Sequence, residues 1–295
     1  QCAWLLTHYE AEWLCAYMEA MSENPEKRAK AIRELKGFGY EIVPIDINLA
    51  EKGWTILDGK KFMPSFYSVK GCGDAAVDEI ITNRPYTSIE QLLWNEDGTW
   101  KHSKFNKRSF ESLIKVGAFE SSNIVGREKT FENYRQMHYA VIENMNEIKH
   151  KKRGRASFDN FVIESRQLEE WPRAERVLFH KEILGNVDLN TIIPKKMQEK
   201  LDAKGITSID DCTEAGGVHW LVVNEAKFKK TRTGKDYLQI VASGEIGKSY
   251  RVFCWAWTAK SPPPGICDVY LAELTKSDFG FSTSSFKVRR LNVES

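Results

Sequence analysis

The chain of 295 residues, with 42% hydrophobic and 28% charged side chains, has the composition of a folded protein of two or three domains, and it contains no apolar run long enough to cross a membrane. Its six cysteines are scattered singly, without the CxxC or Cys/His spacing of a zinc site, so reduced structural thiols are expected. The net charge is only +2, but the basic excess of residues 101–155 (13 Lys/Arg against 6 Asp/Glu) and of residues 225–260 (8 against 3) indicates two local contacts with a polyanion, unless these segments are simply solvated faces.

The first part of the chain predicts helices followed by short strands. An apolar stripe with helical spacing runs through residues 1–36, and the chain begins without Met inside that stripe, as a portion of a longer polypeptide would. The stretch GFGYEIVPIDIN, residues 37–48, switches to a strand because its glycines end the helix. Residues 55–66 predict a hairpin around DGKK.

The stretch KGCGD places two glycines directly before a pattern of apolar residues at helical spacing. Asp74 is the expected N-cap of this helix. A helix N-terminus with bare amides and no overhanging side chain is suited to a phosphate group. An ordinary loop with a glycine stop is the alternative interpretation.

A second glycine turn ends the segment NKRSFESLIKVGAFE. Asn106 is expected to cap a helix that ends at Gly117, and Ser88 and Gln91, between the two turns, have the spacing of a capping box. Two turns on the plan helix, glycine hairpin, helix predict tandem helix-hairpin-helix motifs, which bind DNA phosphates without reading bases. Lysines that merely face solvent are the alternative. The residues predicted to contact duplex DNA are Lys70, Gly71, Cys72, Gly73, Lys107, Arg108, Lys115, Val116 and Gly117.

The middle of the chain predicts further helices. Apolar residues at helical spacing predict one long helix from about Arg127 to His150. The basic run KHKKRGR, residues 149–155, predicts a linker. Another helix is expected at residues 171–184, before an acidic connector.

From residue 218 the pattern changes to short strands separated by turn signals, which predicts an OB-type β-barrel; a β-sandwich fragment is the competing interpretation. Basic residues crowd the first hairpin of this region beside aromatic residues at alternating positions, and a site for single-stranded nucleic acid needs this combination. Phe253 and Trp257 are expected inside the barrel core. The residues predicted to contact a single strand are Lys227, Lys229, Lys230, Arg232, Lys235, Tyr237 and Trp255.

The sequence carries little that indicates catalysis. It has no P-loop, no GxSxG, no HExxH and no dinucleotide fingerprint. The carboxylates of Asp46, Asp78 and Glu79 lack the spacing of a two-metal site. A metabolic enzyme with a helical cap and a barrel is therefore disfavoured.

Four segments, in this order, resemble the C-terminal half of the alpha subunit of bacterial DNA polymerase III, in the divergent form expected of a phage-encoded or distant bacterial copy. They are QCAWLLTHYEAEWLCAYM (the family's fingers), GFGYEIVPIDIN (its Gly-x-x-Val-x-Pro-x-Asp-x-Asn stretch), FYSVKGCGDAAVDEII (its first DNA-binding hairpin) and NKRSFESLIKVGAFE (its second). RAERVLFHKEILG is similar to the helix that leads to the family's OB domain. The resemblance covers most of residues 1–185 and, more loosely, the rest; Ile45 stands where the family has a second Pro.

This resemblance implies a portion of a replicative nucleotidyltransferase that works in the bacterial host cytoplasm. In the family, tandem hairpins hold duplex DNA, the OB domain meets single-stranded template, and the catalytic aspartates, with their Mg²⁺, lie upstream of the matching region. No catalytic residue, metal ligand or cofactor is therefore assigned in this chain. The family's peptide that docks on the sliding clamp is closest to RASFDNF, residues 155–161, which lacks the usual Gln.

These patterns together predict a multidomain α + β chain, in which a helical region with tandem helix-hairpin-helix motifs precedes a small OB-type β-barrel. The expected parts are a fingers-like segment (1–60), a DNA-binding domain (61–150), a helical linker (151–217) and the barrel (218–295). The expected function is the DNA-handling portion of a replicative polymerase, with double-stranded DNA, single-stranded template and the sliding clamp as partners and no membrane. A stand-alone DNA-binding accessory module of a helicase or repair factor is the alternative.

Overall fold

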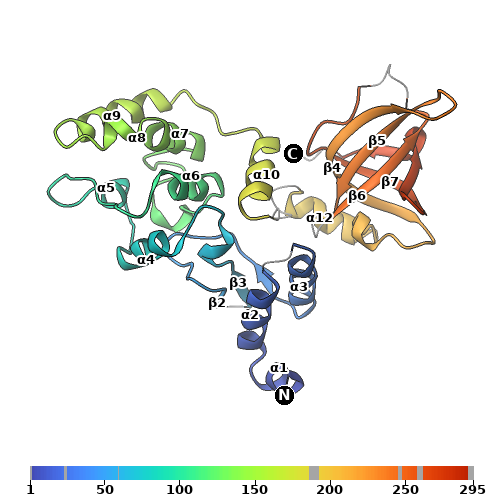
Figure 1. Cartoon of the computed structure of the whole chain (residues 1–295), viewed down its shortest axis with the longest axis horizontal. Helices are drawn as coiled ribbons and strands as arrows, with labels where there is room; N and C mark the ends of the chain where they lie inside the picture. Colours follow the sequence, from blue (N-terminus) through green and yellow to red (C-terminus); the bar gives the residue numbers. More distant parts are fainter. Residues whose placement is uncertain are drawn as a thin grey trace. The chain divides into compact units, whose positions relative to one another are not determined.

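The computed structural model describes residues 2–22, 25–58, 60–185, 193–244, 248–257 and 262–291. The chain forms two compact units, Gln1–Gly185 and Asn186–Ser295, and each is described by itself (Figure 1). The finer division of the first 217 residues into three parts stays a prediction. Within the described residues, no helix has both the length and the apolar character needed to cross a membrane.

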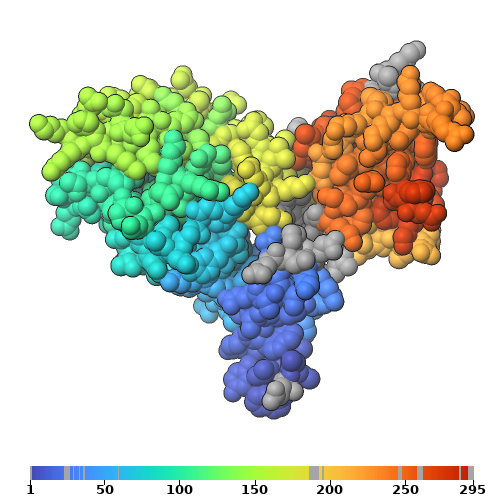
Figure 2. Space-filling view, in the orientation of Figure 1, coloured from blue at the N-terminus to red at the C-terminus, as the bar shows by residue number. Residues whose placement is uncertain are grey.

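The first unit begins with helices and a small sheet, in agreement with the sequence pattern. The elements are α1 (Cys2–His8), α2 (Glu10–Met21), α3 (Pro25–Gly37), β1 (Glu41–Ile42), β2 (Thr55–Leu57) and β3 (Lys61–Met63). β3 pairs with β2 in the antiparallel sense, as the hairpin prediction requires, and with β1 in the parallel sense. α1 buries no residue, and the blue N-terminal helices as a group project from the cyan and green body of this unit (Figure 2).

The remainder of the first unit consists of short helices around one core. They are η1 (Phe66–Ser68), α4 (Asp74–Thr82), α5 (Ile89–Leu93), α6 (Lys107–Lys115), η2 (Glu120–Ser122), α7 (Tyr134–His138), η3 (Tyr139–Glu143), α8 (Met145–Ile148), α9 (Gly154–Ser165) and α10 (Arg173–Ile183). The caps at Asn106 and Ser88 are confirmed: each side chain accepts a hydrogen bond from the amide three residues on. η3 is a π-helical turn between α7 and α8.

The predicted helix from Arg127 to His150 is wrong in its start and in its regularity. The chain pairs Val125 with Phe131 in an isolated bridge, so helical structure cannot start at residue 127. It starts at Tyr134, because the side chain of Asn133 caps the helix by accepting a hydrogen bond from the amide of Gln136 at 3.0 Å. Apolar spacing alone did not reveal this cap.

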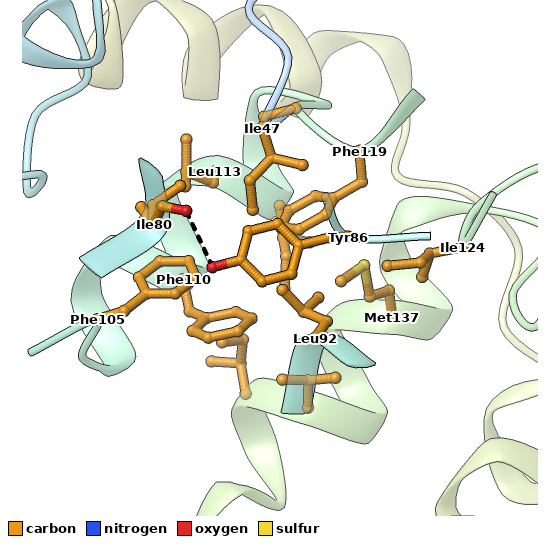
Figure 3. Packing of buried hydrophobic residues seen from close by; sticks show 14 of the residues in the cluster. Ile47, Ile80, Tyr86, Leu92, Phe105, Phe110, Leu113, Phe119, Ile124 and Met137 are labelled. Carbon is orange, nitrogen blue, oxygen red and sulfur yellow. Dashed lines mark hydrogen bonds between the residues drawn. The ribbon is translucent and has the colours of Figure 1, made fainter. Parts of the chain in front are cut away.

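Buried aromatic and aliphatic side chains fill the space between these short helices (Figure 3). Tyr86 is fully buried at the centre, and its hydroxyl donates to the carbonyl oxygen of Ile80 at 3.2 Å. Phe105 and Phe110 stack with their ring centroids 3.9 Å apart. Since Phe105 lies in the loop before α6 and Phe110 lies on α6, this packing fixes the loop against the helix.

The second unit is a closed β-barrel. Its elements are α12 (Lys195–Asp202), η4 (Ile209–Asp211), β4 (Gly217–Lys230), β5 (Asp236–Ser243), β6 (Ser249–Trp255), β7 (Val269–Ser277), β8 (Gly280–Ser284), η5 (Ser285–Lys287) and β9 (Val288–Arg290). Five strands close in the order β4-β5-β6-β8-β7-β4; β6 and β8 are parallel, and the other neighbours are antiparallel. A five-stranded mixed barrel of this kind confirms the OB-type expectation and excludes the sandwich.

Strand alternation separates the barrel core from an outer face. Leu238 on β5 and Val252 and Cys254 on β6 are buried in the core, so the positions between them point outward. Phe253 is one of these outward positions, and its expected place in the core is wrong. Trp257, beyond the end of β6, packs against the core as expected.

Candidate nucleic-acid interface

The first hairpin, residues 69–73, places a row of unpaired amides at the start of α4. Gly71 has a φ of +106°, which a residue with a side chain rarely adopts, and this turns the chain into the helix. The N-cap is Gly73 rather than the expected Asp74, which is the first helical residue. No described residue accepts a hydrogen bond from the amides of Gly71, Gly73, Asp74 or Ala75. A Cβ on Gly73 would meet nothing within 4 Å, so this helix end is open to an anion.

Helix α6 supports the first hairpin through hydrogen bonds from two serine hydroxyl groups. Ser109 Oγ donates to the carbonyl oxygen of Gly71 at 2.7 Å, and Ser112 Oγ donates to that of Lys70 at 2.8 Å. Arg108 also lies against the turn, since a Cβ on Gly71 would come within 3.2 Å of its Cγ. Sequence reasoning missed this support; its signal was a pair of serines three residues apart on an otherwise apolar helix face.

The second turn, residues 115–119, differs from the first because its amides are already used. Val116 and Gly117 donate to carbonyl oxygens of the preceding helical turn, and Ala118 donates to Leu113. The amide of Phe119 donates to Tyr134 Oη at 3.3 Å, and that hydroxyl donates to the carbonyl oxygen of Gly117 at 2.8 Å. The expected contact between these amides and a phosphate therefore has no free donor here.

The side chains around the second turn are also engaged. Lys115 Nζ lies 2.7 Å from Glu111 Oε1 and 4.8 Å from the centre of the Phe179 ring, and Val116 is buried. Partial burial acts to raise the pKa of Glu111, but hydrogen bonding and charge from Lys115 outweigh it and hold this pKa below its usual value. The two glycine turns therefore differ: the first (residues 69–73, the open turn) has free amides, and the second (residues 115–119, the closed turn) does not.

The GFGYEIVPIDIN stretch fixes the second turn through two polar side chains. Asp46 accepts hydrogen bonds from the amides of Asn48 at 2.9 Å and Ser121 at 3.0 Å. The Asn48 side chain bonds both the amide of Tyr86 at 2.8 Å and its carbonyl oxygen at 2.9 Å. Asp46 therefore has a structural role. In the part of the chain that the structure describes, no group of three or more His, Cys, Asp or Glu residues is placed to hold a metal ion.

Three of the predicted cations lie in the open turn or on the adjoining start of α6: Lys70 belongs to the turn, Arg108 packs against Gly71, and Lys107 precedes Arg108. Lys70, Lys107 and Arg108 are exposed, and no described carboxylate lies within 4 Å of their charged atoms. Cys72 is buried, and burial raises the pKa of its thiol to about 12, so it is an inert packing residue. The open turn is therefore electropositive, apart from the Asp74 carboxylate at its edge.

The barrel presents an outer aromatic face made of Tyr237, Phe253 and Trp255. Tyr237 lies opposite Trp255 across β5 and β6, with ring centroids 5.0 Å apart. Phe253 and Trp255 lie 6.3 Å apart with ring planes only 15° from parallel. Trp255 is 42% exposed, and its Nε1 donates to Ser282 Oγ at 2.7 Å, which fixes the plane of the indole. Fixed, partly exposed rings are suited to stacking on bases.

A basic hairpin between β4 and β5 lies beside this face. Lys229 is the cross-strand neighbour of Tyr237, so charge and aromatic ring are adjacent. Lys227 instead pairs with Glu225. The remaining predicted cations, Lys230, Arg232 and Lys235, are exposed at the hairpin end.

The two regions define a class of protein with a helix-hairpin-helix region followed by an OB-type barrel. Residues 39–129 match the family model described as a helix-hairpin-helix motif. DNA polymerase III subunit alpha of Aquifex aeolicus is 26% identical over 242 residues, which are 81% of this chain and 19% of that subunit. The same subunit of Pasteurella multocida is 30% identical, and that of Escherichia coli K12 31%, each over 120 residues, 41% of this chain and 10% of the relative.

The chain is homologous to a segment of DNA polymerase III subunit alpha from its C-terminal region. The matched region spans between a tenth and a fifth of the length of these relatives. The three relatives named are bacterial proteins, and a phage origin of this chain stays a prediction.

Proposed function

We propose that this chain is the part of a DNA polymerase III alpha-like protein that holds duplex DNA by its phosphates. The observation that carries the proposal is the set of unpaired amides at the start of α4, next to Lys70 and Arg108. A phosphate oxygen accepts from such amides whatever the neighbouring base, so the contact positions the duplex without selecting a sequence. The second turn supports α6, and through it the open turn, instead of binding phosphate itself.

The barrel is proposed to guide single-stranded template. The aromatic face offers rings to bases, and the exposed cations of the β4–β5 hairpin offer charge to the sugar-phosphate backbone. Nucleotidyl transfer and Mg²⁺ binding are proposed for the whole protein, with carboxylates outside this chain.

No clamp contact is assigned to the segment at residues 155–161. It lies within α9, where Phe158 is buried and its ring packs edge-on against Trp94 at a centroid distance of 5.1 Å. An aromatic ring that fills the core of its own unit is not available to a partner in this conformation.

Duplex binding should depend steeply on salt and hardly on sequence. In a fluorescence anisotropy titration of the chain against two unrelated 20-base-pair duplexes, the affinities should agree within about threefold, and log K should fall linearly with log salt, by roughly 0.9 per neutralised phosphate. Each base contact contributes about 1–3 kcal/mol of discrimination, so a large difference between the duplexes would reveal base readout. A flat salt response would contradict the proposal.

A further inference from the structure

The basic run predicted as a linker is instead a tight reversal between α8 and α9. Gly154 donates its amide to the carbonyl oxygen of His150 at 2.8 Å, and a Cβ at position 154 would overlap the carbonyl group of Ile148. Lys149 Nζ lies 4.8 Å from the centre of the Trp100 ring, within the range of a cation–π contact. The reversal therefore holds Lys149 in a fixed place.

The charge of Lys149 is not neutralised by any carboxylate in the part of the chain that the structure describes. Partial burial, together with repulsion from Lys107, lowers the pKa of its ammonium group. No described carboxylate lies within 4 Å of either lysine. Arg153, on the same reversal, provides the contrast, since its guanidinium pairs with Glu147 at 3.0 and 3.1 Å. Two cations held close together without an acid are stabilised when an anion lies between them.

These cations continue the open turn. Arg108 lies against Gly71, and Lys107 precedes it at the start of α6. Lys149 lies over Trp100, whose ring centroid is 6.3 Å from that of Phe110 on the same helix.

We infer that Arg108, Lys107 and Lys149 form a basic strip that binds further phosphates of the same DNA strand that the first hairpin holds, with Lys149 as its distal contact. This inference rests on the proposed function, because the phosphate proposed to bind at the start of α4 determines where the DNA strand meets the strip. Phosphates along one strand of B-form DNA are spaced regularly, so a line of fixed cations suits a continuous backbone better than a single small anion.

The test compares Lys149→Ala with Arg153→Ala in the whole chain, by anisotropy against a 20-base-pair duplex from 50 to 300 mM salt. Each variant removes one positive charge from the same reversal, but only Lys149 is free of a carboxylate partner. Lys149→Ala should weaken binding by about five- to tenfold at 100 mM salt and reduce the salt slope by about 1, and Lys149→Arg should restore both. Arg153→Ala should change affinity by less than about twofold.

The outcomes separate the strip from the function on which it rests. If the unmodified chain binds duplex and Lys149→Ala binds as tightly as Arg153→Ala, with the same slope, the strip is overturned and duplex binding stands. If the unmodified chain binds no duplex, both fail. Circular dichroism melting of each variant shows whether the reversal still folds. If Lys149→Ala has a lowered melting temperature, the affinity of Lys149→Arg, which keeps the positive charge over Trp100, still tests the role of the charge.

Discussion

Replacing Glu79 with Ala is expected to lower the free energy of unfolding of the chain by about 3 kcal/mol, which is close to the upper range for a single side chain outside the apolar core. The Glu79 carboxylate accepts hydrogen bonds from three consecutive backbone amides, those of Ser103 and Lys104 at 2.8 Å and that of Phe105. Removing the acceptor takes away three hydrogen bonds to a charged carboxylate, each of which contributes about 1 kcal/mol or more, and leaves the amide of the buried Phe105 without its partner. The loop they belong to leads directly into α6.

The pH dependence of this effect gives an independent check. Partial burial acts to raise the pKa of Glu79, but the three amide donors outweigh it, so the pKa lies below its ordinary value of 4.5. A folded-state pKa below the unfolded one contributes stability that is present above about pH 4.5 and lost as the pH falls through the folded value. The difference between the unmodified chain and Glu79→Ala should therefore narrow below pH 4.

Urea unfolding followed by circular dichroism measures both effects, with Glu96→Ala as the control. Glu96 is exposed, and no hydrogen bond or ion pair joins its side chain to a described residue. Its removal should change the unfolding free energy by less than about 0.5 kcal/mol. Equal stabilities of the two variants at pH 7 would show that the carboxylate does not hold this loop.

Replacing both Tyr237 and Trp255 with Ala is expected to weaken binding of a single-stranded oligonucleotide by about a hundredfold. Stacking on an aromatic side chain contributes roughly 1–3 kcal/mol per base, and the two rings lie side by side on the outer face. The barrel should keep its fold, since the core positions of the same strands, Leu238 and Cys254 among them, are unchanged.

Anisotropy with a labelled 12-base single strand measures this loss, and Ile266→Ala is the control for a lost apolar side chain outside the aromatic face. Ile266 is 51% exposed, in the segment before β7. Duplex affinity should be nearly unchanged in the double variant, because the open turn belongs to the other unit. An unchanged single-strand affinity would remove the aromatic face from the proposed function.

Local signals predicted the elements that position the site. The Asn106 and Ser88 caps, the β2–β3 hairpin and the alternation in the barrel strands each depend on residues close together in sequence, and each is present. The glycine pair of the first hairpin was equally readable, because a positive φ at Gly71 is a local requirement.

The features that sequence reasoning missed depend on partners far along the chain. The second turn resembles the first in sequence, yet its Phe119 amide is taken by Tyr134, fifteen residues later. Phe253 could have faced either side of the barrel until the pairing of β6 with β5 and β8 fixed its register. Residues 149–155 carry the composition of a linker, but Lys149 packs on Trp100.

The most direct measurement of the central claim compares Asp74→Pro with Asp74→Ala. Proline lacks the amide hydrogen, and it is favoured at the first helical position, which Asp74 occupies. Gly73, with φ −93° and ψ 167°, already has the extended backbone that a residue before proline requires. Both variants lose the carboxylate, so they differ in one donor at the proposed phosphate site.

In a duplex titration at 100 mM salt, the proline variant should bind about tenfold more weakly than the alanine variant, because an amide bonded to a phosphate oxygen makes a charge-assisted hydrogen bond. The two variants should have matching melting curves. Equal duplex affinities in two equally stable variants would contradict the claim that the amides at the start of α4 hold the DNA.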